Sequence, residues 1–246
     1  MKYFIRKKDK VKQILSKLRL ALFLVSAIVL SANVFSVSAK EKTDHKASLP
    51  SEKVTAREVF KKLHSSALEI LPSSTRLDML DYWDVDSIYK AMNALGGLSW
   101  LENLNDTYLK VRVSQVSSLE IKILPVKKGE IIMTVYTVGD APEASDSEIK
   151  FYDTELNPLQ ATKYFSSPQL KDFFSIPKGS ETNMKEIEGM IPFPTIEYNA
   201  SPDNNDLTAK LTVEQYINQD DWNILKIFLK DKVVMEWKKD KYRVMK

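Results

Sequence analysis

From Thr107 onward the chain alternates apolar and polar residues, and this pattern limits the fold more than any other feature. In "YLKVRVSQ" and "SLEIKILP" the apolar residues fall on one side of the chain and the charged residues on the other. Such alternation is typical of strands with one buried and one solvated face. "EIIMTVYTV", residues 130–138, is apolar on both sides and is predicted to be a central strand. Short connections between these runs and "SEIKFYDT", residues 147–154, predict an antiparallel meander.

Helical spacing precedes the strands. "TARE" forms a capping box in which Thr55 and Glu58 satisfy each other's backbone groups, so a helix is predicted to begin at Thr55. An apolar stripe then recurs every three or four residues. Because a residue before proline is pushed out of the helical region, this helix is predicted to end at Leu71-Pro72.

A second helix is predicted from Ile88 to Leu95, and Gly96 would end it in the left-handed conformation. Two catalytic interpretations of the double glycine Gly96-Gly97 fail on their motif requirements. A phosphate loop needs its glycines before a helix rather than after one. A nucleophile elbow needs G-x-S-x-G, and "GLSWL" lacks the last glycine. The glycines are therefore predicted to have a structural role.

The C-terminal third mixes both kinds of pattern. A short helix at 168–174 and a looser stretch at 175–194 are followed by predicted strands at 195–200 and 206–213. "QDDWNILKIFLKD" is an amphipathic helix, and "KVVMEW" and "KYRVM" pair as a closing hairpin. This order predicts an α+β fold: a mostly antiparallel sheet, made of the meander and the C-terminal hairpin, with the N-terminal helices packed on it. Residues 55–246 are predicted to form a single domain.

The N-terminus has the composition of a targeting segment. Residues 1–19 carry eight Lys or Arg and one acid, and "LALFLVSAIVLSANVFSVSA" follows without a charge. With the small residues before Lys40, residues 1–39 are predicted to be a secretory signal peptide. The uncharged run is also long enough to cross a membrane, so an uncleaved anchor stays open as the alternative. The polar residues 40–54 are predicted to be a flexible leader.

Charge and cysteine content exclude several function classes. Without residues 1–39 the chain keeps 28 of its 36 basic and 32 of its 33 acidic residues, a net charge of −4. Nucleic acid is not expected as a partner, because its binding requires a concentrated basic surface. The chain has no cysteine, which excludes disulfides, thiolate metal sites and cysteine nucleophiles. Membrane contact is expected only through an uncleaved N-terminal segment.

Acidic residues gather in "RLDMLDYWDVD", where Asp78 and Asp81 share one face of a helix. They are the catalytic candidates, as an acid–base pair, with helix capping and solvation as the alternative interpretation. The two histidines, His45 and His64, lie in the leader and on the first helix, so they are not expected to meet at a metal. No cofactor and no metal site are predicted.

The binding candidates are three aromatic residues: Trp83, Trp100 and Tyr136. Aromatic side chains belong to the core when buried and mark a contact surface when exposed. The sheet face that carries Lys110, Arg112, Glu120 and Lys122 is expected to be solvated unless something covers it. Because 130–138 is apolar on both sides, a helix is expected over one face, and the C-terminal segment or a partner over the other.

Several quoted stretches occur together in one known family. "RLDMLDY", "NALGG", "YLKVRVSQVSSLEIKILP" and "DSEIKFYDTELNPL" stand in that order, followed by "LTVEQYI" and "VVMEWKKDKYRV". The chain resembles domain-of-unknown-function family 3256, uncharacterised exported proteins of Bacteroidetes. Relatives have a glycine in the last hairpin turn, where this chain has Lys238-Lys239-Asp240. The resemblance implies export and a single compact domain, and supplies no catalytic residue.

These observations favour an exported protein, periplasmic or at the cell surface, that serves as a non-enzymatic binding or structural module of the envelope. Its expected partner is an envelope protein or a glycan. The alternative is an envelope hydrolase that uses Asp78 and Asp81. The two hypotheses predict different positions for these side chains. An enzyme would bury its carboxylates in a pocket, whereas a binding module would expose aromatic surface.

Overall fold

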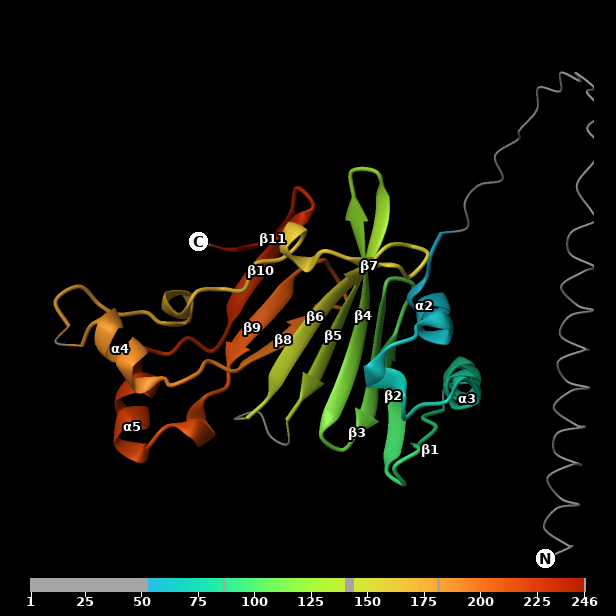
Figure 1. Ribbon diagram of the computed structural model, residues 1–246, viewed down its shortest axis with the longest axis horizontal. Helices are drawn as coiled ribbons and strands as arrows, with labels where there is room; N and C mark the ends of the chain where they lie inside the picture. Colours follow the sequence, from blue (N-terminus) through green and yellow to red (C-terminus); the bar gives the residue numbers. More distant parts are fainter. Residues whose placement is uncertain (1–52, 86, 140–143, 181, 246) are drawn as a thin grey trace, which may run out of the picture. The chain divides into compact units, whose positions relative to one another are not determined.

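The alternating segments form a seven-stranded antiparallel meander, β1 to β7 in chain order, in the computed structural model of the protein (Figure 1). The structure describes residues 53–245 except 86, 140–143 and 181. The predicted signal peptide 1–39 and nearly all of the predicted leader 40–54 lie outside the described residues. The strands are β1 Ala91–Met92, β2 Leu98–Leu104, β3 Tyr108–Ser114, β4 Ser117–Val126, β5 Gly129–Val138, β6 Asp146–Tyr152 and β7 Pro158–Leu159.

The sequence pattern predicted β3 to β6, and these strands are confirmed. Strand β2 was not predicted, because its alternation is broken in two ways. A β-bulge shifts the register between Leu101 and Asn103. Ser99 also occupies a buried position, where its hydroxyl donates to the Val113 carbonyl at 2.5 Å. The buried serine and the nearby bulge interrupt the alternation of apolar and polar residues by which a strand is recognised in a sequence.

A second, four-stranded antiparallel sheet has the order β11-β10-β9-β8. Its strands are β8 Ile196–Ala200, β9 Leu207–Leu211, β10 Val233–Lys238 and β11 Lys241–Val244. The two predicted strands and the closing hairpin are thereby confirmed, but they form a sheet of their own, whereas the sequence predicted one sheet made of the meander and the hairpin. Strand β8 lies against β4, β5 and β6 of the first sheet, so the C-terminal segment covers one face of the meander (Figure 1).

The first helix is shorter than the sequence predicted. Helix α2 spans Ala56–Lys62, and Thr55 caps it as expected by accepting from the Glu58 backbone N–H at 3.2 Å. The prediction that it runs to Leu71 is wrong. Buried Arg76 donates to the carbonyls of Phe60 and Leu63, so it replaces the hydrogen bonds that another helical turn would make. A 3-10 turn, Ser66–Leu68, follows the break.

The predicted helix from Ile88 to Leu95 is wrong. Helix α3, Ser73–Asp84, ends before it, and Ala91–Met92 pairs with β2 as strand β1. Asn93 explains the difference, because its side-chain oxygen accepts from the N–H groups of Leu95 and Gly97, at 3.0 Å each. Its amide donates to the Val113 carbonyl at 3.2 Å. These bonds to the turn and to a distant strand override the local helical spacing.

Gly96 has a φ of 77°, so the left-handed conformation expected there is present. It belongs to the β1–β2 hairpin turn, and the prediction that it ends a helix is corrected accordingly. The double glycine keeps the structural role that its motif context indicated.

Further helical segments lie between β7 and β8, and between β9 and β10. The predicted short helix at 168–174 is a 3-10 turn, Leu170–Phe173. The stretch at 175–194, expected to be loose, contains helix α4, Met184–Met190, which begins with a reciprocal cap between Asn183 and Glu186. Helix α5, Gln219–Phe228, is the predicted amphipathic helix. Two more 3-10 turns are Ala161–Lys163 and Glu214–Tyr216.

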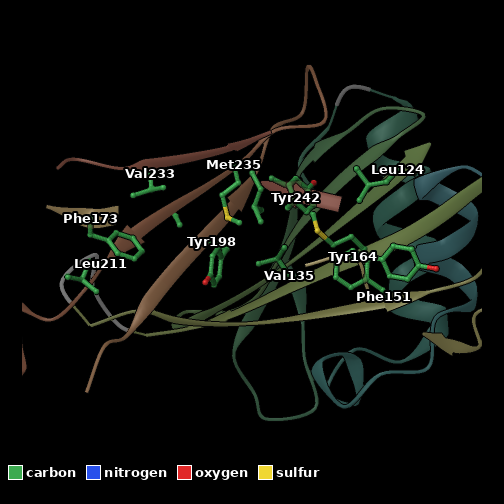
Figure 2. Close-up of a cluster of buried hydrophobic side chains, with 14 of the residues drawn as sticks. Leu124, Val135, Phe151, Tyr164, Phe173, Tyr198, Leu211, Val233, Met235 and Tyr242 are labelled. Carbon is green, nitrogen blue, oxygen red and sulfur yellow. The ribbon is translucent and has the colours of Figure 1, made fainter. Parts of the chain in front are cut away.

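Each face of the meander has its own core. On one face α2, the 3-10 turn and α3 pack on side chains such as Leu109, Val111 and Ile121. Figure 2 shows the other core, where Val135 and Phe151 of the first sheet meet side chains of the second sheet and the segments beside it. The fold is therefore α+β, with helices, sheet and second sheet as successive layers.

The central strand β5 is covered on both sides, as its double apolar pattern required. Ile132 belongs to the helix-covered core, whereas Met133 and Val135 belong to the core between the sheets. Tyr136 is half-buried against the helix-covered core. The middle of the sheet therefore offers no open surface at Tyr136.

Candidate functional site

The charged side chains that alternate along β3 and β4 lie under the second sheet. Glu120 is 3% exposed and Lys122 is 2% exposed. The cover is strand β8 and the turn after it, which is the C-terminal segment of the chain. The sheet face that was expected to be solvated unless covered is therefore covered. The C-terminal segment covers it, which was one of the two covers expected, the other being a partner.

Strand β8 is an edge strand, and the first sheet caps its free N–H groups with side chains. Asp146 Oδ1 accepts from the Ile196 N–H at 3.1 Å, and Ser147 Oγ accepts from the Tyr198 N–H at 3.0 Å. Glu120 Oε2 accepts from the Ala200 N–H at 2.7 Å. An unpaired edge strand invites pairing with other chains, so these acceptors both attach the second sheet and protect its edge.

Glu120 also forms an ion pair with Lys110, with a distance of 3.0 Å between Nζ and Oε1. Burial raises the pKa of the Glu120 carboxyl, while Lys110 and the Ala200 N–H oppose this effect and Glu197 adds to it. Burial and the charge of Glu120 also raise the pKa of the nearby Tyr108 hydroxyl. A buried carboxylate with two donors is thus held in a fixed position between the sheets.

Lys122 secures the turn after β8. Its Nζ donates to the Ser201 carbonyl at 2.9 Å and lies 5.8 Å from the centroid of the Tyr108 ring. Burial lowers the pKa of Lys122, and the negative charge of Asp203 opposes this effect. The buried charges of this face therefore hydrogen-bond the backbone of the second sheet.

Beside the buried pair, a polar hollow of about 230 Å³ opens between the first sheet and β8. Its described lining is almost entirely polar, with Val116 as the one large apolar side chain. The polar side chains from the first sheet and the β3–β4 turn are Lys110, Arg112, Gln115, Ser117, Ser118 and Thr137, and those from β8 are Glu197 and Asn199.

Two groups on opposite walls of this hollow keep hydrogen-bonding capacity. Arg112 donates from Nε to Glu102 at 3.0 Å, and its two terminal nitrogens have no protein partner among the described residues. Glu197 accepts from Asn199 Nδ2 at 2.9 Å through Oε1, and its other oxygen has no protein partner among the same residues. The hollow can therefore both donate to and accept from a ligand.

Trp100, a binding candidate from the sequence, does not line this hollow but lies on the strand next to Arg112, which does. It is the register partner of Arg112 on the neighbouring strand. It is half-buried, and Lys90 Nζ lies 5.1 Å from the centroid of its ring. Met92, which pairs with Leu98, is 72% exposed, and Leu98 is 42% exposed. An aromatic and partly exposed apolar surface on β1 and β2 is therefore adjacent, through strand pairing, to Arg112 of the hollow.

The other candidate residues lie apart from the hollow. Asp78 and Asp81 are exposed on α3, and neither lines it. Trp83 and Tyr136 are half-buried and pack against the helix-covered core. Acid–base carboxylates are usually placed where burial and neighbouring charges tune them, and the exposure of Asp78 and Asp81 adds no support for that role.

Sequence reasoning missed Glu197 and Asn199, because they come from a strand more than eighty residues after Arg112. The one available signal was the charged alternation on β3 and β4, and it pointed to the correct face. Within the described part of the chain, no three His, Asp or Glu side chains gather as metal ligands. In the same part, no helix has the length and apolar character needed to cross a membrane.

Comparisons with known proteins place this fold in context. The profile of a family described as "Protein of unknown function (DUF3256)" matches residues 48–242. A solved structure of a domain of an uncharacterised protein from Porphyromonas gingivalis W83 is similar, with a TM-score of 0.63 and 21% sequence identity. The similarity covers 77% of this chain and 96% of that one, and shows the fold alone. A comparison with curated proteins finds no match.

Proposed function

The chain belongs to the DUF3256 family of proteins of unknown function, and from that premise we propose that it is an exported, non-enzymatic binding module of the cell envelope. The observation that carries this proposal is the polar hollow beside Trp100. Its partner is an envelope protein or a glycan, as the composition of the chain led us to expect.

The hollow has the properties of a prepared binding site. Its wall groups are held in place before a ligand arrives, because Lys110 is paired with buried Glu120 and Arg112 with Glu102. The terminal nitrogens of Arg112 remain available, and they form a planar fork suited to paired hydrogen bonds. Rigid, supported side chains with unused hydrogen bonds favour specific recognition, since little conformational freedom is lost on binding.

Export is supported by the basic region, the uncharged run and the small residues within 1–39. We expect N-terminal sequencing of the protein recovered from the periplasm or the cell surface to begin at or near Lys40. Recovery with Met1 intact would show an anchored form instead. Recovery from the cytoplasm alone would contradict export.

The binding role is tested by affinity capture from envelope extract, with the exported protein as bait and mass spectrometry as the readout. We expect an envelope protein or glycan to be captured by the wild type and lost with Arg112→Ala. Asp78→Ala is the matched control, because it removes an exposed charge away from the hollow. Thermal unfolding of all three baits separates loss of binding from loss of folding. Identical capture by wild type and Arg112→Ala would contradict a binding role for the hollow.

A further inference from the structure

The balance of charge in the hollow indicates which ligands it favours. Lys110 and Arg112 each have a carboxylate partner, Glu120 and Glu102, so their positive charges are compensated. Glu197 adds a negative charge on the facing wall. A site for phosphate or carboxylate needs an excess of positive charge, and these walls have none. This charge balance disfavours an anionic ligand.

The arrangement of donors and acceptors narrows the class further. Arg112 offers two donor nitrogens from β3, whereas the free oxygen of Glu197 and the side-chain oxygen of Asn199 are acceptors on β8. Ser118 adds a hydroxyl from β4. A ligand that bridges these walls must accept on one side and donate on the other. Each hydroxyl group of a sugar does both, and neighbouring hydroxyls match planar side chains such as guanidinium, carboxylate and amide.

The lining and size of the hollow agree with a sugar. Pockets for drug-sized ligands are mostly apolar and begin at about 300 Å³. This hollow has about 230 Å³ and an almost wholly polar lining, so it suits one small polyhydroxylated ring. A peptide side chain of apolar character would find little apolar surface inside it, because Val116 is its one large apolar side chain.

Trp100 provides the complementary apolar surface next to the hollow. Residues directly opposite each other on paired strands have Cβ atoms about 4.5–5.5 Å apart, so its indole begins one strand away from Arg112. The C–H face of a sugar ring packs on an aromatic ring, and an indole offers the largest such surface. Lys90 over the ring is exposed, so it can move aside for a ligand.

We propose that the hollow binds one ring of a neutral glycan, with Arg112, Glu197 and Asn199 on its hydroxyl groups and Trp100 stacked on the adjoining ring. This assignment rests on the binding function proposed above and specifies its ligand class. It adds Glu197 and Asn199, which the sequence did not identify, to Trp100, which it did.

The test is isothermal calorimetry of the exported protein with oligosaccharides of glucose, mannose, galactose and N-acetylglucosamine, and with oligogalacturonate as the acidic probe. We expect at least one neutral oligosaccharide to bind and oligogalacturonate to bind at least tenfold more weakly. Arg112→Ala and Trp100→Ala should each weaken the neutral ligand about tenfold or more. Glu197→Gln removes the charge with little change of shape, so it provides a second reading if Arg112→Ala unfolds.

Trp83→Phe is the control for Trp100→Ala, because Trp83 packs against the helix-covered core away from the hollow. Absence of binding by all four neutral series at millimolar concentration would overturn the assignment, as would unchanged affinity in the three hollow variants or tighter binding of oligogalacturonate. If affinity capture yields a protein partner through Arg112 while no sugar binds, the glycan assignment fails and the binding function stands. If neither is obtained, both fail.

Discussion

Each face of the seven-stranded sheet binds a covering layer, and the two faces use different side chains to do so. The helix-covered face presents apolar residues such as Leu109, Val111 and Ile121. The face under the second sheet combines apolar residues such as Val135 and Phe151 with the charged residues of β3 and β4, and Glu120 and Lys122 are also buried there. Alternation along a strand therefore places apolar and charged side chains on opposite faces of the sheet. It does not show that the charged face is solvated.

The covering layers explain this difference. The helices α2 and α3 satisfy most of their own backbone hydrogen bonds, so their contact with the sheet can be apolar. Strand β8 reaches the sheet with a free edge, and its N–H and C=O groups need partners. Glu120 accepts from the Ala200 N–H of this strand, and Lys122 donates to the Ser201 carbonyl in the turn that follows it. The helical side shows the same relation between unpaired backbone groups and buried charge. Arg76 donates to the carbonyls that have no helical partner at the end of α2.

The largest expected effect comes from the apolar face. Phe60 is fully buried in the helix-covered core, and Phe60→Ala should lower the free energy of unfolding by about 3–5 kcal/mol. The loss combines transfer of the ring with the cavity left behind. Chemical denaturation measures it, with exposed Tyr82→Ala as the control expected to change stability by less than about 1 kcal/mol. If Phe60→Ala lowered the free energy of unfolding by less than about 1 kcal/mol, the packing of the helices on the sheet would contribute little to stability.

The charged face should respond less strongly, and through hydrogen bonds. Glu120→Ala leaves the Ala200 N–H without an acceptor and Lys110 without its partner, so we expect a loss of about 2–3 kcal/mol. Hydrogen exchange at the Ala200 amide should accelerate more than exchange at Leu109 in β3. Equal acceleration at both amides would show global unfolding, and would contradict a local role for Glu120 in holding β8.

The pH dependence of stability sharpens the same comparison. Burial raises the pKa of Glu120 in the folded state, so folding favours its protonated form. The stability that this protonation contributes is fully present below the unfolded pKa of about 4.3 and is lost as pH rises through the folded pKa. Wild-type stability relative to Glu120→Gln should therefore fall with rising pH over that window. A rise instead would show that Lys110 and the Ala200 N–H outweigh burial.

The smallest expected effect concerns the second sheet alone. Lys239 and Asp240 connect β10 to β11 with φ values of 50° and 60°, a conformation that costs a lysine more than an asparagine. Lys239→Asn should raise the melting temperature slightly, corresponding to about 0.5 kcal/mol, without touching either face of the first sheet. Asp240 is left unchanged because its carboxylate accepts from the Lys127 N–H. A gain of similar size from Lys239→Ala would contradict this backbone explanation.

The sequence by itself determined the strands β3 to β6, the closing hairpin, the helix α5 and the α+β class. Each has a period, a cap or a turn that its own residues specify, because local sterics and the burial of an alternating face act over a few residues. It also indicated that 130–138 needs cover on both sides. The left-handed conformation of Gly96 was predictable too, although the element that it ends was not.

Only the tertiary structure decided what covers each face. The end of α2 depends on Arg76, the strand β1 depends on Asn93 bonding to β3, and the burial of Glu120 depends on the edge of β8. The hollow likewise joins Arg112 to Glu197 across a long separation in the chain. In each case a polar side chain satisfies a backbone or side-chain group far away in sequence. Such a partner cannot be predicted from the residues near it in the sequence, because its position is fixed only when the layers pack together.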